Sequence, residues 1–206
     1  AIALTIANVG FIGILSFHFI DLSAKYFVNH AITIPLASYQ LPTTPIDNYE
    51  LCVHRSNQGY ICLKTFDDKD ITKRELSFQF LNFKDPQNNR KNISGTFELM
   101  NQKQQKDHIA IVIPFDESND YFYYNYKLNY VNQVKGKIYF ENNEQIVFHP
   151  DDSEATIDWG RGVWPYKSIW YWSSATTHTK QGDRIGFNLG YGFGNNCKAT
   201  ENVFYY

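Results

Sequence analysis

The sequence predicts an all-β protein, an antiparallel barrel or sandwich with little helix. Short runs of β-branched and aromatic residues alternate with period two, and no stretch of about 10–15 residues has a helical apolar period. Aromatic residues, which favour strands, make up 17% of the 206 residues. Polar turn clusters separate the runs at nearly even spacing, as in barrels and sandwiches rather than in sheets with helical crossovers.

The first apolar stretch, residues 1–20, is expected to form strands and not a membrane span. Asn8, Gly10 and His18 interrupt it, and no basic residue precedes it. A polar turn at residues 21–25 then leads the chain into a third strand, which completes a meander.

The other expected strands continue this antiparallel series to the last residues of the chain. Two of them form a hairpin around the turn sequence Ser-Asn-Gln-Gly. The strands after the first stretch are expected at residues 26–35, 49–55, 59–66, 75–83, 94–100, 108–115, 120–131, 135–140, 144–150, 155–162, 168–174, 184–193 and 201–206.

The domain organisation is expected to be simple. Both ends of the sequence lie within apparent strands, so residues 1–206 are expected to be a fragment of one β domain, truncated at both ends. Residues 41–48 contain two prolines and are the best candidate for an internal boundary or a long loop.

The net charge and the spacing of the histidines give no indication of nucleic-acid or metal binding. The formal net charge is −2 and the isoelectric point is near 6.3, which gives no electrostatic attraction to nucleic acid. The six histidines show no H-x-H or H-E-x-x-H pattern, so no metal site and no cofactor are expected. No transmembrane segment is expected, and no pattern indicates an oligomeric state.

The three cysteines favour a reducing compartment and a cytoplasmic location, because they form no C-x-x-C pair and no even set. Cys52 and Cys62 flank the expected hairpin and can face each other across its strands. A disulfide is the alternative for an exported protein, but the sequence favours buried free thiols.

Residues 158–172, DWGRGVWPYKSIWYW, contain all four tryptophans of the chain. Strand alternation places Trp170 and Trp172 on one face and Tyr171 on the other. The Gly-Arg-Gly and Trp-Pro sequences before them indicate a sharp, irregular connection. This Trp segment is therefore the first candidate for a functional site.

Two interpretations of the Trp segment are open. In the structural one, the indoles close the end of a barrel, and Arg161 stacks on an indole while Asp158 or another carboxylate meets its charge. In the functional one, the rings line a cavity, and Asp158, Arg161 and Tyr166 supply polar or proton-transferring groups. Aromatic clusters are more often core than catalytic, which favours the structural interpretation.

Residues 184–193 place Gly186, Asn188 and Gly190 on one face of an expected strand. A turn and a strand follow instead of a helix, so the glycines are not a dinucleotide-binding loop. A bare glycine face lets another backbone, an indole or a ligand approach closely, and packing is the favoured reason for it.

The order of the motifs D-W-G-R-G, W-P-Y, W-x-W, I-G-x-N-L-G and T-E-N resembles the DUF2804 family of unknown function, as does the early stretch LTIANVGFIGILSFHFID. The acidic residue before W-G and the later W-x-W also resemble carotenoid hydratase-like proteins, which are lipocalin-type barrels. Those proteins tend to have a histidine after the acidic residue, whereas Trp159 follows Asp158 here, so no histidine-dependent chemistry is implied. The resemblance implies an antiparallel lipocalin-like (calycin-type) barrel, or a pair of partly open barrels, with a hydrophobic cavity.

Three functions follow as hypotheses. The first is binding of a hydrophobic small molecule, a lipid or an isoprenoid-like compound, in a barrel cavity. The residues expected to line that cavity are Trp159, Trp164, Trp170, Trp172 and Asn188. The second is a cofactor-independent hydratase, isomerase or cyclase for an apolar substrate, with Asp158 as general acid and with Arg161 and Tyr166 orienting it. The third is a carbohydrate-binding β-sandwich whose exposed rings stack on sugars.

Overall fold

The computed structural model describes residues 1–206 except 86, 88–89, 103–107, 119 and 132, and except the side chain of Asn129. The regular structure of the described residues consists of β-strands paired antiparallel, with no helix among them. The strands are β1 (Ile2–Asn8), β2 (Ile12–Asp21), β3 (Tyr26–Pro35), β4 (Tyr49–Arg55), β5 (Gly59–Asp67), β6 (Ile71–Asp85), β7 (Arg90–Gln102), β8 (His108–Pro114), β9 (Phe122–Val131), β10 (Gln133–Phe140), β11 (Gln145–Phe148), β12 (Ala155–Val163), β13 (Tyr171–His178), β14 (Arg184–Tyr191) and β15 (Val203–Tyr205). A helix capable of crossing a membrane is likewise not found in the described part of the chain.

The chain divides into two compact units, each made of two segments. Unit 1 comprises Ala1–Met100 and Gln133–Ser153, and unit 2 comprises Asn101–Asn132 and Glu154–Tyr206. Residues 41–48, the candidate boundary, lie inside unit 1 as part of the loop between β3 and β4.

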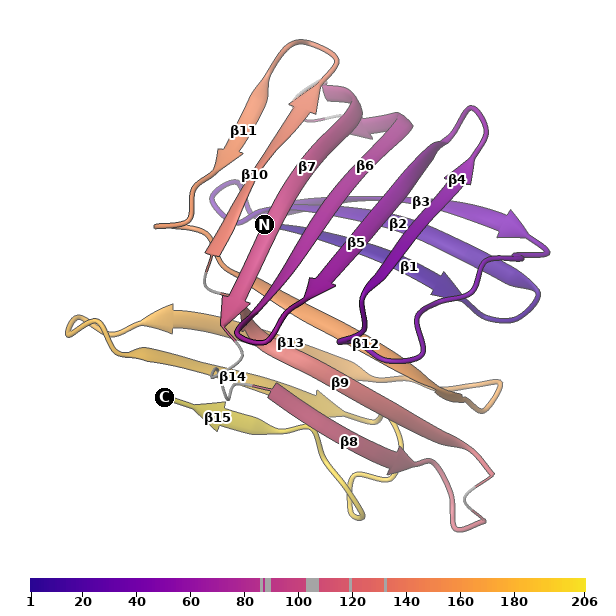
Figure 1. The fold of residues 1–206 in the computed structure, drawn as a ribbon. Helices are drawn as coiled ribbons and strands as arrows, with labels where there is room; N and C mark the ends of the chain where they lie inside the picture. Colours follow the sequence, from indigo (N-terminus) through magenta and orange to yellow (C-terminus); the bar gives the residue numbers. More distant parts are fainter. Residues whose placement is uncertain (86, 88–89, 103–107, 119, 132) are drawn as a thin grey trace. The chain divides into compact units, whose positions relative to one another are not determined.

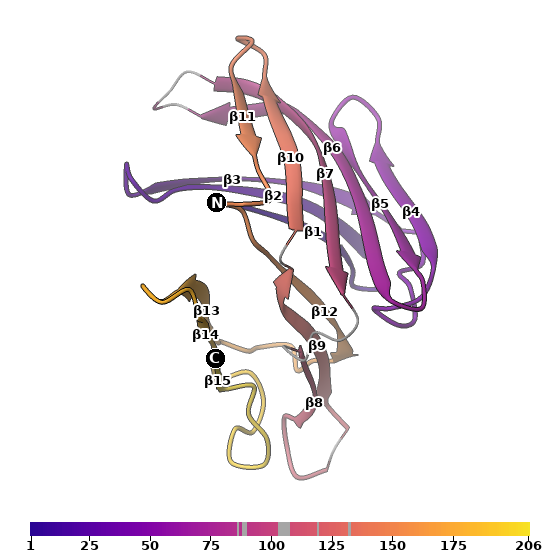
Figure 2. The same ribbon diagram turned by 60° about the vertical axis from the view of Figure 1, so that its left-hand side comes forward.

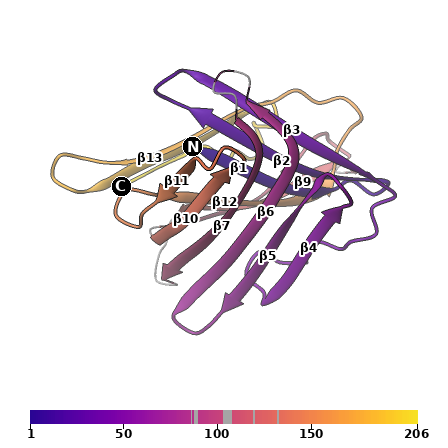
Figure 3. The same ribbon diagram turned by 90° about the horizontal axis from the view of Figure 1, so that it is seen from above.

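Unit 1 consists of a meander and a half-barrel. The meander has the strand order β1-β2-β3, and the half-barrel is a curved six-stranded sheet of order β11-β10-β7-β6-β5-β4 (Figures 1 and 3). Phenylalanines join the two sheets. The Phe17 ring of β2 lies 5.3 Å from the ring of Phe78 and 5.5 Å from that of Phe83, both on β6, and all three side chains are fully buried.

The β4–β5 hairpin confirms the expected register but not the expected state of its cysteines. Cys52 and Cys62 are direct partners across the two strands and are joined in a disulfide. Cys52 is exposed and Cys62 is half-buried, because both side chains lie on the face of the hairpin that points away from buried Val53 and Ile61. The prediction of buried free thiols was therefore wrong for this pair.

Unit 2 consists of two three-stranded sheets, β12-β9-β8 and β13-β14-β15 (Figure 2). Side chains of β9 bridge the two sheets. The Tyr130 ring packs on the His178 ring at 6.4 Å and lies under the Arg184 guanidinium at 3.9 Å, so β13 and β14 both contact β9.

Strand β13 begins three residues later than the sequence predicts. Its first residue, Tyr171, pairs with Tyr191, the last residue of β14. Gly192 follows with a φ of +85°, a left-handed conformation that turns the chain away. Trp170 consequently has no strand partner on β14, and the expected alternation from Trp170 to Trp172 within one strand is not formed.

Candidate functional site

The strand pair β9–β12 presents polar side chains on one of its faces. Register pairs Lys127 with Asp158 and Asn125 with Gly160, so these side chains share a face of the sheet. Tyr123 follows on the same face, paired with Gly162. A Cβ atom on Gly160 would lie 2.6 Å from the Tyr123 ring, which means that the glycine makes room for this ring.

The opposite face of β12 carries Trp159 and Arg161. The Trp159 ring packs edge-on against Tyr124 at 5.6 Å, and Arg161 is paired in register with the same tyrosine. Arg161 is three residues from Asp158, and an odd spacing puts two side chains of a strand on opposite faces. No ion pair or hydrogen bond joins Arg161 to Asp158 in the described part of the chain, and no cation–π contact joins it to an indole. The expected contacts of Arg161 are therefore not formed.

The second sheet of unit 2 contributes Trp172 and Asn188, and the segment before β15 contributes Glu201. The Trp172 indole Nε1 donates a hydrogen bond of 2.9 Å to Asn188 Oδ1. Asn188 Nδ2 in turn donates to the Glu201 backbone oxygen at 2.8 Å and to its carboxylate Oε2 at 3.1 Å. A Cβ atom on Gly190 would collide with the Glu201 carboxylate, so the glycine face predicted from the sequence serves packing.

The two sheets meet at Lys127. Its ammonium group forms an ion pair with the Glu201 carboxylate, lies 3.8 Å from Asp158 Oδ2 and lies 4.7 Å from the centre of the Trp172 ring. The side chains of Lys127 and Glu201 are 3% and 6% exposed, whereas that of Asp158 is 44% exposed. We refer to Asn125, Lys127, Asp158, Asn188 and Glu201 together as the polar network.

Asp158 is the open end of the polar network and carries a perturbed carboxyl group. Burial by its surroundings raises the pKa of Asp158, and the charge of Lys127 and a hydrogen bond from Asn125 oppose this shift. The hydrogen bond runs from Asn125 Nδ2 to Asp158 Oδ1 over 2.7 Å. The negative charge of Glu201 also raises the pKa of Asp158, because both carboxylates lie near the ammonium group of Lys127.

Tyr123 stands beside this carboxyl group as a protonated hydroxyl. Asn125 Nδ2 also donates to the Tyr123 hydroxyl. Burial raises the pKa of Tyr123, and the charges of Asp158 and Glu201 raise it further. Asn125 is fully buried, and its Oδ1 has no hydrogen-bond partner among the described residues. A buried acceptor without a donor is uncommon in folded proteins.

The tryptophans occupy three different surroundings. Trp164 and Trp170 pack around the Phe193 ring at 6.3 and 4.9 Å, and Tyr123 packs on the same ring at 4.5 Å. Trp172 lies over Lys127, and Trp159 lies on the far face of β12. The exposed fractions of Trp164, Trp170 and Trp172 are 39%, 55% and 46%, and Tyr166 is fully exposed.

Sequence reasoning named Asp158, Trp172 and Asn188 but missed Tyr123, Lys127 and Glu201. The signal for Lys127 is its position in YYNYKLNYV, where Asn125 and Lys127 alternate with Tyr and Leu. Glu201 belongs to the T-E-N motif, but the sequence gives no indication of its role. Its pairing with Lys127 spans 74 residues, which no local pattern encodes.

A family model described as a domain of unknown function, DUF2804, matches residues 1–206. The chain belongs to the DUF2804 family. No curated protein and no solved structure matches it. Four motifs that carried the resemblance, D-W-G-R-G, W-x-W, N-L-G and T-E-N, each supply one side chain to the connected set Asp158, Trp172, Asn188 and Glu201, with Lys127 at its centre.

Two hollows of about 470 and 630 Å³ lie in unit 1, and the Trp segment lines neither of them. The larger hollow lies over the outer face of the half-barrel sheet and has a charged lining. Its charged residues are Glu50, Lys64, Glu75, Glu98, Lys135 and Lys137. Because none of the four tryptophans lines either hollow, these hollows are not the cavity expected from the sequence.

Proposed function

We propose that unit 2 binds an amphipathic small molecule of lipid or isoprenoid type. Its apolar part lies against the exposed indoles of Trp164, Trp170 and Trp172, and its hydroxyl or carbonyl group meets the carboxyl group of Asp158. The single observation that carries the proposal is the fixed, half-exposed Trp172 indole, which is hydrogen-bonded to Asn188 and stacked on Lys127 beside the open carboxyl of Asp158.

Preorganisation supports this proposal. An exposed aromatic ring that is already fixed loses little conformational entropy when a ligand covers it. The Trp172 ring meets this condition because two buried side chains, Lys127 and Asn188, hold it from within the unit. The ring offers apolar area, and the neighbouring carboxyl group offers one point of polar recognition, the combination common in small-molecule sites.

The composition of the polar network also supports a functional role. Buried ion pairs contribute little net stability, since desolvation offsets most of their attraction, and apolar side chains of similar volume often stabilise as well or better. A network that only joined two sheets would need neither two carboxylates around one ammonium nor the unpaired Asn125 acceptor. A closed lipocalin-like barrel and a cytoplasmic location stay predictions.

Ligand binding can be tested by thermal shift and by intrinsic fluorescence, since every tryptophan lies in unit 2. At a ligand concentration of about 100 Kd, binding adds roughly 2.7 kcal/mol of stability. For a chain of this length, that gain corresponds to an increase in Tm of roughly 5–10 °C. The panel is a set of fatty alcohols, fatty acids and polyprenols.

Two matched variants locate the site. Trp172→Phe should weaken the response, whereas Trp159→Phe should preserve it because Trp159 lies on the opposite face of β12. If the whole panel changes neither emission nor Tm, the proposed ligand class is wrong. If both variants lose the response equally, the ligand does not bind at the polar network.

The raised pKa of Asp158 favours a second candidate function, a cofactor-independent hydratase or isomerase. A carboxyl group protonated nearer neutral pH can transfer its proton to a carbon of an alkene, and water then adds its oxygen and returns a proton to the carboxylate. In this candidate Lys127 and Tyr123 stand beside the acid, in place of Arg161 and Tyr166. Incubation with polyprenyl alkenes in D2O should label the product, and Asp158→Asn should abolish labelling; unlabelled substrate with the wild type refutes the candidate.

We rank carbohydrate binding third. Stacking on sugars favours aromatic rings that form a flat platform. The Trp164 ring is inclined by 37° to Tyr123 and by 49° to Phe193, and the Trp170 ring by 60° to Phe193. These inclined rings suit a ligand that is enclosed on several sides better than one that lies flat.

A further inference from the structure

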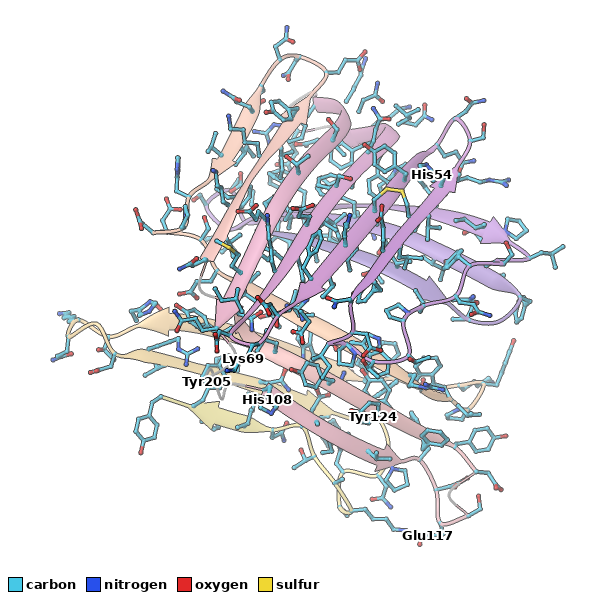
Figure 4. The ribbon with its side chains drawn as sticks, viewed as in Figure 1. His54, Lys69, His108, Glu117, Tyr124 and Tyr205 are labelled. Atoms are coloured by element: carbon cyan, nitrogen blue, oxygen red, sulfur yellow. A yellow bond between two sulfur atoms is a disulfide. The ribbon has the colours of Figure 1, made fainter. Side chains whose placement is uncertain are left out.

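The outer face of the β4–β5 hairpin gathers three side chains with metal-ligating atoms. Cys52 and His54 are two residues apart on β4 and share this face, and Cys62 lies directly opposite Cys52 on β5. The ligand atoms of the three residues all lie within 4.8 Å of one another. Figure 4 shows His54 beside the two sulfur atoms, near the outer end of the hairpin.

We propose that Cys52, His54 and Cys62 bind one Zn²⁺ ion when the disulfide is reduced. Thiolate and imidazole ligands select zinc over magnesium or calcium. Three protein ligands leave one of the four tetrahedral positions for water, an arrangement found in zinc sites that exchange ligands. The site therefore has two states, a disulfide without metal and a dithiolate with metal.

Conversion of the disulfide state to the zinc-bound state needs a reductant. A thiol or phosphine reductant supplies two electrons and breaks the S–S bond, which yields two thiols. A dithiol reductant becomes a disulfide, and a phosphine becomes a phosphine oxide with the oxygen of water. Zinc binding then releases the two thiol protons, because the thiolate is the ligand.

The surroundings of the three residues favour a preformed site. The imidazole of His54 packs on the ring of Tyr60, its register partner, with 5.4 Å between ring centres. Antiparallel pairing on both sides of β5 fixes the backbone of Cys62, since β6 continues the sheet. The ion does not need to order a loop, and the exposure of Cys52 and His54 gives it a path from solvent.

This site could not be recognised from local sequence spacing, because its ligands come from two strands. Cys52 and His54 form a C-x-H pair, and Cys62 follows after the hairpin turn, so none of the usual zinc spacings appears. Strand register supplies the missing proximity. The expectation that the chain has no metal site rested on local spacing alone.

Co²⁺ is the probe for a test with the full chain. The protein is reduced with a phosphine without oxygen, freed of reductant, checked for three free thiols and titrated with Co²⁺. We expect a thiolate-to-cobalt charge-transfer band, intense visible bands of tetrahedral Co²⁺, saturation at one ion per chain, and loss of both band sets on addition of Zn²⁺ but not of Mg²⁺. Oxidised protein should show no such bands.

Variants decide which residues hold the ion. Loss of a side chain that only hydrogen-bonds to a metal ligand weakens metal binding roughly 10–100-fold. Cys52→Ser and Cys62→Ser should each weaken Co²⁺ binding by more than this. His54→Gln should shift the visible bands. Cys197→Ser is the matched control, because Cys197 is exposed and lies in unit 2. Circular dichroism checks that each variant keeps its β structure.

Several results would overturn the proposal. Absence of the bands in reduced protein refutes the site, and so does a hairpin disulfide that resists reduction in the folded chain. Equal loss of the bands with Cys197→Ser would show binding elsewhere, and unchanged spectra for His54→Gln would show adventitious binding by two thiols.

Discussion

Replacement of Lys127 by methionine should strongly destabilise unit 2. Methionine is similar in length to lysine and can keep the contact with the Trp172 ring, so the substitution mainly removes the charge. The Glu201 carboxylate, 6% exposed, then loses its ion-pair partner and keeps its hydrogen bond from Asn188. Breaking one side of a buried ion pair costs about 3–5 kcal/mol.

Urea denaturation followed by Trp emission measures this loss, because all four tryptophans report on unit 2. With a slope of about 1–3 kcal/mol per molar urea, a loss of about 3–5 kcal/mol should lower the midpoint by roughly 1–5 M. Lys198→Met is the matched control. It removes the Lys198–Glu117 ion pair of the same unit, whose side chains are 39% and 82% exposed, and should cost less than about 1 kcal/mol.

A double variant separates charge from packing. Lys127→Met combined with Glu201→Leu removes both charges and should recover most of the lost stability, because apolar replacement of a buried pair is often neutral or stabilising. Equal, small effects of Lys127→Met and Lys198→Met would refute the reasoning, since Lys127 and Glu201 would then not be a buried pair.

Three further outcomes are expected. Burial raises the pKa of Asp158 in the folded protein, so its contribution to stability is present below the unfolded pKa near 3.8 and is lost as the pH rises through the folded pKa. Relative to Asp158→Asn, the wild type should thus gain stability in urea titrations as the pH falls from 7 to 4; a constant difference contradicts this. Gly160→Ala should cost about 1–3 kcal/mol because its Cβ would strike the Tyr123 ring, and an unchanged urea midpoint would count against that contact. Phe17→Ala should destabilise unit 1 by about 3–5 kcal/mol, measured by circular dichroism, and a loss under 1 kcal/mol would place Phe17 outside the core.

The strands could be predicted from the sequence because burial on one face imposes period two. Residues 49–55 and 59–66 illustrate this, since their alternation and turn fixed the hairpin and the Cys52–Cys62 register. Strand alternation also predicts on which face Arg161 lies, because its odd spacing from Asp158 places the two side chains on opposite faces of the strand.

The site could be predicted only in part because its contacts are made between distant strands. The Trp segment supplied Asp158 and Trp172, yet their shared neighbour Lys127 comes from β9 and its partner Glu201 from the segment before β15. No local pattern shows which sheets face each other. The bonding state of the cysteines was also beyond the sequence, since strand register brings two sulfur atoms together whether or not they are oxidised.

The most direct test of the ligand site is an NMR titration that observes the four indole N–H signals of ¹⁵N-labelled protein. Each tryptophan gives one signal, and Trp172 is identified by loss of its signal in Trp172→Phe. With a fatty alcohol or polyprenol, the signals of Trp164, Trp170 and Trp172 should shift together with one Kd, while that of Trp159 stays in place. Shifts confined to Trp159, or no shift at saturating ligand, would contradict a binding site at the polar network.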